Sequence, residues 1–283
     1  IQANVDFWPT SPANNLLLRE ICTTATSLSA EDTIPGMLPL KALRATGVLT
    51  VRGWKNVIRN PAVVWLRFAM YVALALMIGT VWWGTGKDIV AGNIHNVSGV
   101  LFFISAFMGF MSISAMPAFL EDKTIMIKER ANGCYGAFTY SVAAMLVTLP
   151  FVFLLSVVVG SICYGCLFLN DTQGRFFLFI LNLFVTLAVA ESVIALVSAI
   201  VPFFIVGIAA AAFVFGGFMM VEGFFIKADD IHPGWRWLYS ISFHTYAFAN
   251  FMHIEFDGRT IGADLNAVPP SPNAFEGALV LED

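Results

Sequence analysis

The stretch FTYSVAAMLVTLPFVFLLSVVVGSICYGCLFL, residues 138–169, contains no charged side chain. A helix of about 20 apolar residues crosses the hydrocarbon core of a bilayer, so this run is long enough to span a membrane. The whole chain of 283 residues is 58% hydrophobic and only 12% charged, whereas soluble domains carry about 25% charged residues. So much apolar surface requires lipid around it, which excludes a soluble enzyme or a nucleic-acid-binding protein.

Four further segments are apolar and long enough to cross a bilayer, which makes five predicted spans. They cover residues 63–83, 97–120, 138–169, 176–201 and 203–221. The sequence therefore predicts an all-α polytopic membrane protein. Basic residues of the short connections lie mainly before the first span and between the second and third. The positive-inside rule then places the N-terminus in the cytosol.

The segments outside the spans differ in composition. Residues 1–36 are rich in Pro, Ser, Thr and Asn and are predicted to be a linker. Residues 37–60 place apolar and basic side chains on adjacent helical arcs, which predicts an amphipathic connecting helix in the headgroup layer or a solvated helix that caps another domain. Residues 222–256 are aromatic but too interrupted to span, and we expect re-entrant or interfacial outer helices. Residues 257–283 are predicted to form an extracellular loop.

Two charged residues, Arg67 and Glu191, lie inside the predicted spans, and Glu222 follows the fifth. Glu191 falls near the middle of the fourth span, where a lone carboxylate is costly unless it is paired, hydrogen-bonded or protonated. It is either a structural hydrogen-bonding group facing a Ser, Thr or Asn of a neighbouring helix, or a proton relay or gating switch. Arg67 is expected to snorkel to the headgroups, and Glu222, at the outer end of the fifth span, is expected to be solvated.

Motifs that carry catalysis are missing from the sequence. It contains no phosphate-binding P-loop, no nucleophile elbow, and no histidine spacing that would suit a zinc site. We therefore assign no catalytic residue and no metal-binding residue to this chain.

A series of short motifs in a fixed order resembles one protein family. The motifs are RNP at 59–61, IGTVWWG at 78–84, GVLFF at 99–103, KERANGCY at 128–135, AES at 190–192, GFF at 223–225 and WRWLYSISFHTYA at 235–247. Together they resemble the ABC-2 type transmembrane domain of half-size ABC transporters of the G subfamily, the White type and its plant branch that exports cuticular lipids. The resemblance covers about residues 37–265.

The resemblance implies a type II exporter fold with six spans in each half, of which five are present here. It places a nucleotide-binding domain before the membrane domain, and ATP and Mg are expected on that domain rather than on this chain. The complete transporter would couple ATP hydrolysis to transport as a homo- or heterodimer. Because the chain begins with Ile1 rather than Met, we expect it to be part of a longer protein, with the sixth span following residue 283.

The resemblance also implies site residues by position. The segment 121–137 corresponds to the coupling loop that contacts the nucleotide-binding domain. Its predicted contact residues are Glu129, Arg130, Gly133 and Tyr135. The predicted substrate-binding residues are Phe103, Phe107 and Phe110 in the second span and Met219 in the fifth. Phe224 and Phe225 correspond to the apolar pair that plugs the exit.

The leading hypothesis is therefore the membrane domain of an ATP-driven exporter of lipids, sterols or other hydrophobic molecules. We expect it in the plasma membrane, with an organelle membrane as the alternative. A proton-coupled carrier that uses Glu191 is the first rival. A non-transporting membrane scaffold is the second, suggested by the many small residues of the fifth span.

Overall fold

The computed structural model describes residues 39–59, 61–87, 89, 93–170, 174–227, 230–261 and 275–276. The predicted linker at 1–36 and most of the predicted outer loop at 257–283 lie outside the described residues. Contacts between residues divide the chain into two units, residues 1–48 and residues 49–283. The second unit contains all of the predicted spans.

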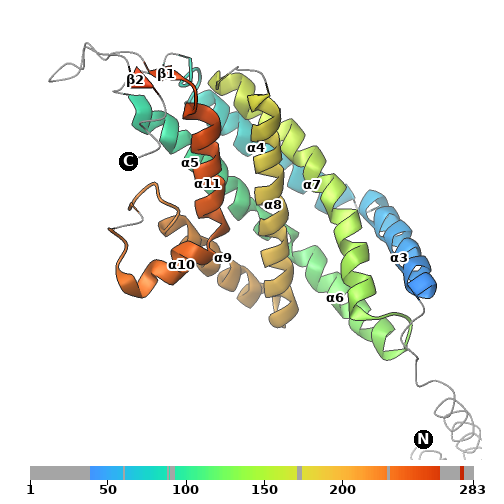
Figure 1. The fold of residues 1–283 in the computed structure, drawn as a ribbon. Coiled ribbons are helices and arrows are strands. Elements are labelled where there is room, and N and C mark those ends of the chain that lie inside the picture. Colours follow the sequence, from blue (N-terminus) through green and yellow to red (C-terminus); the bar gives the residue numbers. More distant parts are fainter. Residues whose placement is uncertain are drawn as a thin grey trace, which may run out of the picture. The chain divides into compact units, whose positions relative to one another are not determined.

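The described residues are almost entirely helical, which confirms the predicted all-α class. The helices are α3 (Pro39–Arg59), α4 (Pro61–Val81), α5 (Ile94–Phe110), η3 (Met111–Ala115), α6 (Met116–Ala131), α7 (Ala137–Leu167), α8 (Arg175–Ile200), α9 (Phe204–Met220), η5 (Pro233–Trp235), α10 (Arg236–Ile241) and α11 (Phe243–Phe256) (Figure 1). Two short strands, β1 (Thr260–Ile261) and β2 (Phe275–Glu276), pair antiparallel after the last helix.

Within the described part of the chain, four helical stretches are long and apolar enough to cross a bilayer. They are Val64–Val81, Ile94–Ala131, Ala137–Leu167 and Arg175–Ile200, and they correspond to the first four predicted spans. The fifth predicted span is α9, a shorter apolar helix of 17 residues.

The second span does not end where the charges begin. Hydropathy places its end at residue 120, but the helix continues through η3 and α6 as far as Ala131. Hydropathy reports where lipid ends, whereas Glu, Lys, Met and Ala all favour helix whether or not lipid surrounds them. Most of the predicted coupling loop at 121–137 is therefore helical.

The core lies where α5, α8 and α11 meet. α7 packs along α8 and α4, and α11 packs against α8 and α5 (Figure 1). Phe102 of α5, Phe179 of α8 and Phe251 of α11 are almost completely buried there. The predicted outer segment 222–256 thus contains a helix, α11, that contributes to the core of the domain.

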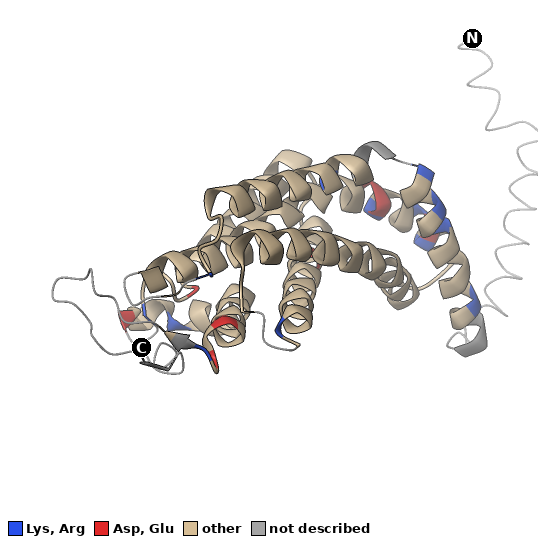
Figure 2. Ribbon diagram, turned by 90° about the horizontal axis from the view of Figure 1, so that it is seen from above, with Lys and Arg blue, Asp and Glu red and all other residues tan. Residues whose placement is uncertain are grey.

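Close helix contact depends on small residues at one crossing. A Cβ on Gly79 of α4 would lie 2.8 Å from the Cβ of Cys166 on α7, which is too close for any larger side chain. Small residues let helices approach in this way inside membranes. Charged side chains concentrate near the ends of the long helices, and the ribbon between is nearly free of them (Figure 2).

Candidate functional site

The turn after α6 presents two of the predicted contact residues to solvent. α6 ends at Ala131, and Gly133 follows with φ +73°, a left-handed conformation that glycine adopts without steric cost. Its amide donates to the Arg130 carbonyl, which closes the turn. Arg130 and Gly133 are both exposed, as a surface that contacts another domain must be.

The other two predicted contact residues meet inside the same turn. The Tyr135 hydroxyl donates to one Glu129 oxygen at 2.5 Å, and the Arg52 guanidinium donates to the other at 2.5 Å. Burial, together with the hydrogen bond to Glu129, raises the pKa of Tyr135 to about 12. The hydrogen bond to Glu129 raises the pKa of Arg52, and the same bond lowers the pKa of Glu129, so Arg52 and Glu129 are both charged at neutral pH.

Arg52 is a residue that the sequence did not single out. It lies on α3, and its link to Glu129 joins the connecting helix to the turn after α6. Its side chain is half exposed, so the pair contributes modestly to stability and mainly sets geometry. The only available signal was its place in the basic arc of residues 37–60, which it shares with four other basic residues.

The predicted substrate-binding phenylalanines lie along one half-buried face of α5. The Phe103 and Phe107 rings stack with centroids 4.8 Å apart, and Trp82 lies 5.1 Å from Phe103. Phe110 faces a second cluster, where its nearest ring is Phe215 at 6.5 Å. Phe103, Phe107 and Phe110 are half-buried, whereas the residues between them are buried. The face is therefore built from partly exposed aromatic rings.

Phe224 and Phe225 pack against the N-terminal half of α5, where both rings contact Phe102. Met219 and Phe224 pack against the same core cluster as Phe103. The Phe224 ring stacks on Phe102 at 4.9 Å, whereas Phe225 is 64% exposed. The structure thus brings the two predicted plug residues together, with their ring centroids 5.2 Å apart.

Glu191 is paired, but with a different partner from the one expected. The Arg67 guanidinium donates to Glu191 Oε1, joining α4 to α8 across 124 residues of sequence. The prediction of a Ser, Thr or Asn partner was therefore wrong, and so was the prediction that Arg67 snorkels, since Arg67 is only 8% exposed. An opposite charge compensates the buried carboxylate better than a hydroxyl does. The Arg67 guanidinium also lies 5.3 Å from the Phe151 ring centre.

Glu222 is buried, which contradicts the prediction of a solvated residue. It is 1% exposed and faces His244 of α11, with 3.9 Å between Oε2 and Nδ1. Burial raises the pKa of Glu222 to about 9, against a smaller opposite effect of Ser105, and burial lowers the pKa of His244 to about 4. Both groups are therefore neutral at pH 7. The place of Glu222 in the sequence gives no sign of this burial, because the burial arises where α11 folds back over the end of α9.

Comparison with known proteins shows the family of this chain. Residues 44–256 match the family described as "ABC-2 type transporter". The chain belongs to this family. Among its relatives, ABC transporter G family member 11 of Arabidopsis thaliana is 34% identical over 227 residues, which are 80% of this chain and 32% of that protein. ABC transporter G family member 1 of Petunia hybrida is 32% identical over 216 residues, or 76% of this chain and 34% of that protein.

These relatives confirm the G-subfamily resemblance of this ABC-2 membrane domain. The chain spans about a third of the length of the curated relatives it matches. The matched segment begins within α3 and ends with α11, so it contains the Arg52–Glu129 link, the aromatic face and both buried polar pairs. The family match and the long apolar helices together make this chain an integral membrane domain.

Proposed function

We propose that this chain is the membrane domain of an ATP-driven exporter of lipids, sterols or other hydrophobic molecules. The observation that carries the proposal is the aromatic face of α5 within an ABC-2 membrane domain. A nucleotide-binding domain of the full-length protein would hold ATP and Mg, and two membrane domains would form a homo- or heterodimer. The cytosolic N-terminus and the plasma membrane, with an organelle membrane as the alternative, belong to the same proposal.

The chemistry of the aromatic face supports apolar cargo. Phe103, Phe107 and Phe110 offer ring surface and no hydrogen-bonding group, and Met219 adds a flexible apolar side chain. Apolar surfaces hold ligands by area and distinguish similar ones only weakly. Such a face therefore suits a class of hydrophobic molecules rather than a single compound.

The turn after α6 supports coupling to a motor domain. Arg130 and Gly133 are exposed for contact, while Glu129 and Tyr135 tie the turn to α3 through Arg52. A push on the exposed turn would then move α3 together with α6. This gives the nucleotide-binding domain two connected helices on which to act.

ATP hydrolysis by the full-length protein, reconstituted into liposomes, tests the proposal. We expect added sterols or long-chain lipids to stimulate ATP hydrolysis, and Phe107→Ala to reduce that stimulation severalfold. Phe177→Ala is the matched control, because Phe177 lies on α8 and is 73% exposed. A protein that neither hydrolyses ATP nor responds to any hydrophobic compound would refute the proposal.

The two rivals gain less from the structure. A proton carrier would have to separate Glu191 from Arg67 in each cycle, and transport that needs a proton gradient but no ATP would favour it. The scaffold was suggested by the small residues of α9. One of these, Gly207, serves internal packing, since a Cβ there would lie 2.5 Å from the sulfur of Met116.

A further inference from the structure

A cavity of about 520 Å³ lies away from the aromatic face of α5, between α3, α4, α6, α7 and α8. Its volume is within the range of small-molecule sites. Neither Phe103, Phe107, Phe110 nor Met219 lines it. The cavity is therefore separate from the predicted substrate face, and the function proposed above does not account for it.

Two buried polar atoms mark one end of the cavity. Arg67 and Glu191 both line it, and they are 92% and 97% buried, taking the complements of their exposed fractions of 8% and 3%. Their ion pair uses Glu191 Oε1, which leaves Glu191 Oε2 and Arg67 Nε without a partner among the described residues. A buried polar atom without a hydrogen bond is costly, so this end of the cavity presents one donor and one acceptor to an occupant.

The charges at this end select the polar group of the occupant. A hydroxyl both donates and accepts, so it can satisfy Arg67 Nε and Glu191 Oε2 together. A carboxylate could accept from Arg67 but would face the negative Glu191, and an ammonium could donate to Glu191 but would face the positive Arg67. An alkane would satisfy neither atom. A neutral hydroxyl is therefore the best match.

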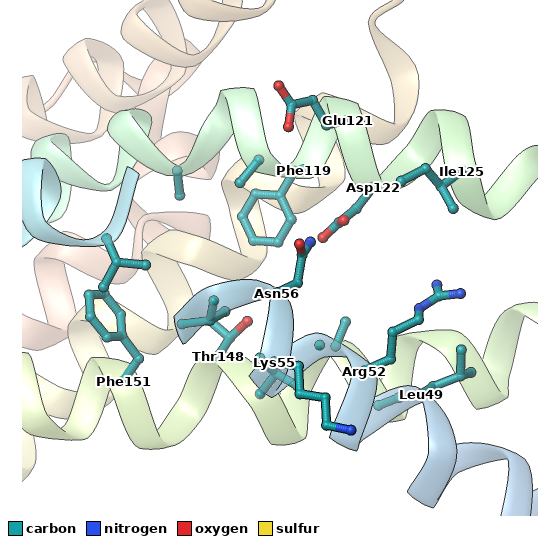
Figure 3. A pocket seen from close by; sticks show the side chains of 18 of the residues that line it. Leu49, Arg52, Lys55, Asn56, Phe119, Glu121, Asp122, Ile125, Thr148 and Phe151 are labelled. Carbon is teal, nitrogen blue, oxygen red and sulfur yellow. The ribbon is translucent and has the colours of Figure 1, made fainter. Parts of the chain in front are cut away.

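Apolar side chains line the cavity at both ends and in the middle, among charged and polar ones such as Arg52 and Lys55. Phe151 lies near the ion pair, the Phe119 ring faces the middle, and Leu49 and Ile125 lie at the opposite end (Figure 3). Polar residues such as Asn56 and Asp122 point toward one another across one side (Figure 3). An extended apolar body thus has contacts over the whole distance from the ion pair to Leu49.

α3 closes the cavity against α7. A Cβ on Gly53 would come within 2.8 Å of the Val147 side chain, so the two helices are in close contact there. Val147 lines the cavity beside Ala143 and Ala144, whose small side chains leave the space open. A larger side chain at residue 144 would therefore reduce the space without touching the ion pair.

We propose that this cavity binds a neutral long-chain alcohol, with its hydroxyl between Arg67 Nε and Glu191 Oε2 and its chain along Phe151, Phe119 and Ile125. This site is additional to the aromatic face, and occupying it requires no ATP. Its binding can therefore be measured, and can fail, independently of the exporter function proposed above.

The test uses the purified full-length protein in detergent without nucleotide. A photoreactive C16 alcohol with a diazirine in its chain is cross-linked, and the labelled peptides are identified by mass spectrometry. Competition by 1-hexadecanol, hexadecanoate, hexadecylamine and hexadecane then compares head groups at one chain length. We expect labels on α6 or α7. Hexadecanol should compete about tenfold better than the other three compounds, because its hydroxyl alone makes both buried hydrogen bonds.

Ala144→Leu should reduce labelling about tenfold or more by filling the cavity. Ala199→Leu is the matched control, since Ala199 is exposed on α8 and does not line the cavity, and it should label like the parent. Equal competition by hexadecane, or stronger competition by the acid or the amine, overturns the proposal. So does an absence of saturable labelling on α6 and α7, which would mean that water alone serves the two atoms. The head-group series needs no variant, so it decides the matter even if Ala144→Leu does not fold.

Discussion

Replacing Arg67 by methionine would leave the Glu191 carboxylate buried without its cation. Glu191 is 3% exposed, so water in the adjoining cavity is the only replacement for the lost cation, and it carries no compensating charge. Removing one member of a buried ion pair costs about 3–5 kcal/mol, because the remaining charge keeps its desolvation penalty and loses its compensation. The contacts of the arginine with the Phe151 and Tyr71 rings would also be lost. We therefore expect Arg67→Met to lower the free energy of unfolding by about 3–5 kcal/mol.

Removing both charges should recover most of this loss. Apolar residues of similar volume often replace a buried ion pair at little or no cost, so Arg67→Met with Glu191→Leu should be within about 1 kcal/mol of the parent. Denaturant unfolding in detergent, followed by tryptophan fluorescence, measures the parent, both single variants and the double variant.

An exposed ion pair provides the control. Arg175 and Asp257 lie 3.1 Å apart, and the Asp257 side chain is 61% exposed. Asp257→Asn should therefore cost no more than about 1 kcal/mol. If Arg67→Met costs no more than this control, or if the double variant is as unstable as the single one, the reasoning from burial is refuted.

Three further predictions concern other contacts. Tyr135→Phe removes the hydroxyl that donates to Glu129 at 2.5 Å. It should lower the free energy of unfolding by about 1 kcal/mol and weaken lipid-stimulated ATP hydrolysis. Unchanged stimulation of ATP hydrolysis would argue against a role for this link in coupling. Glu222→Gln should flatten the pH dependence of stability. The pKa of Glu222 is raised from 4.5 to about 9, so as pH rises between these values the unfolded chain loses the proton first and the parent loses up to about 1.4 kcal/mol per pH unit. Melting temperatures from pH 6 to 9 measure this, and a parent curve as flat as the variant's would contradict a buried carboxyl. Asn170 begins the glycosylation sequon Asn-Asp-Thr, but it is 7% exposed and its side-chain amide donates to the Glu255 carbonyl at 3.1 Å. Asn170→Gln should therefore leave any glycan-dependent gel shift unchanged, and loss of a shift would show that Asn170 carries the glycan.

Hydropathy predicted the helices well because it reports a property of contiguous residues. The apolar run 138–169 became α7, and residues 176–201 became α8, each within two residues of its predicted ends. The same signal failed at α6, which continues past the start of the charges. A helix needs favourable backbone propensity, whereas hydropathy measures only the preference for lipid.

Motif order was enough to predict the family, and the ABC-2 match confirms it. The motifs also pointed to Glu129 and Tyr135, which do meet, since six residues around one turn bring them within reach. The sequence offered no comparable signal for Arg52, whose partner Glu129 is 77 residues away. Local patterns predict local contacts. The contact between Arg52 and Glu129 is not local, because it depends on where α3 lies relative to α6.

The class of this protein and its helical segments follow from sequence alone, because lipid solvation and backbone hydrogen bonding act on each segment separately. Which buried charges face one another is a property of the packed bundle. Arg67 meets Glu191 only because α4 and α8 lie together, and Glu222 loses its water only because α11 covers the end of α9. The cost of burying a charge depends on what surrounds it, and those surroundings exist only once the helices have assembled.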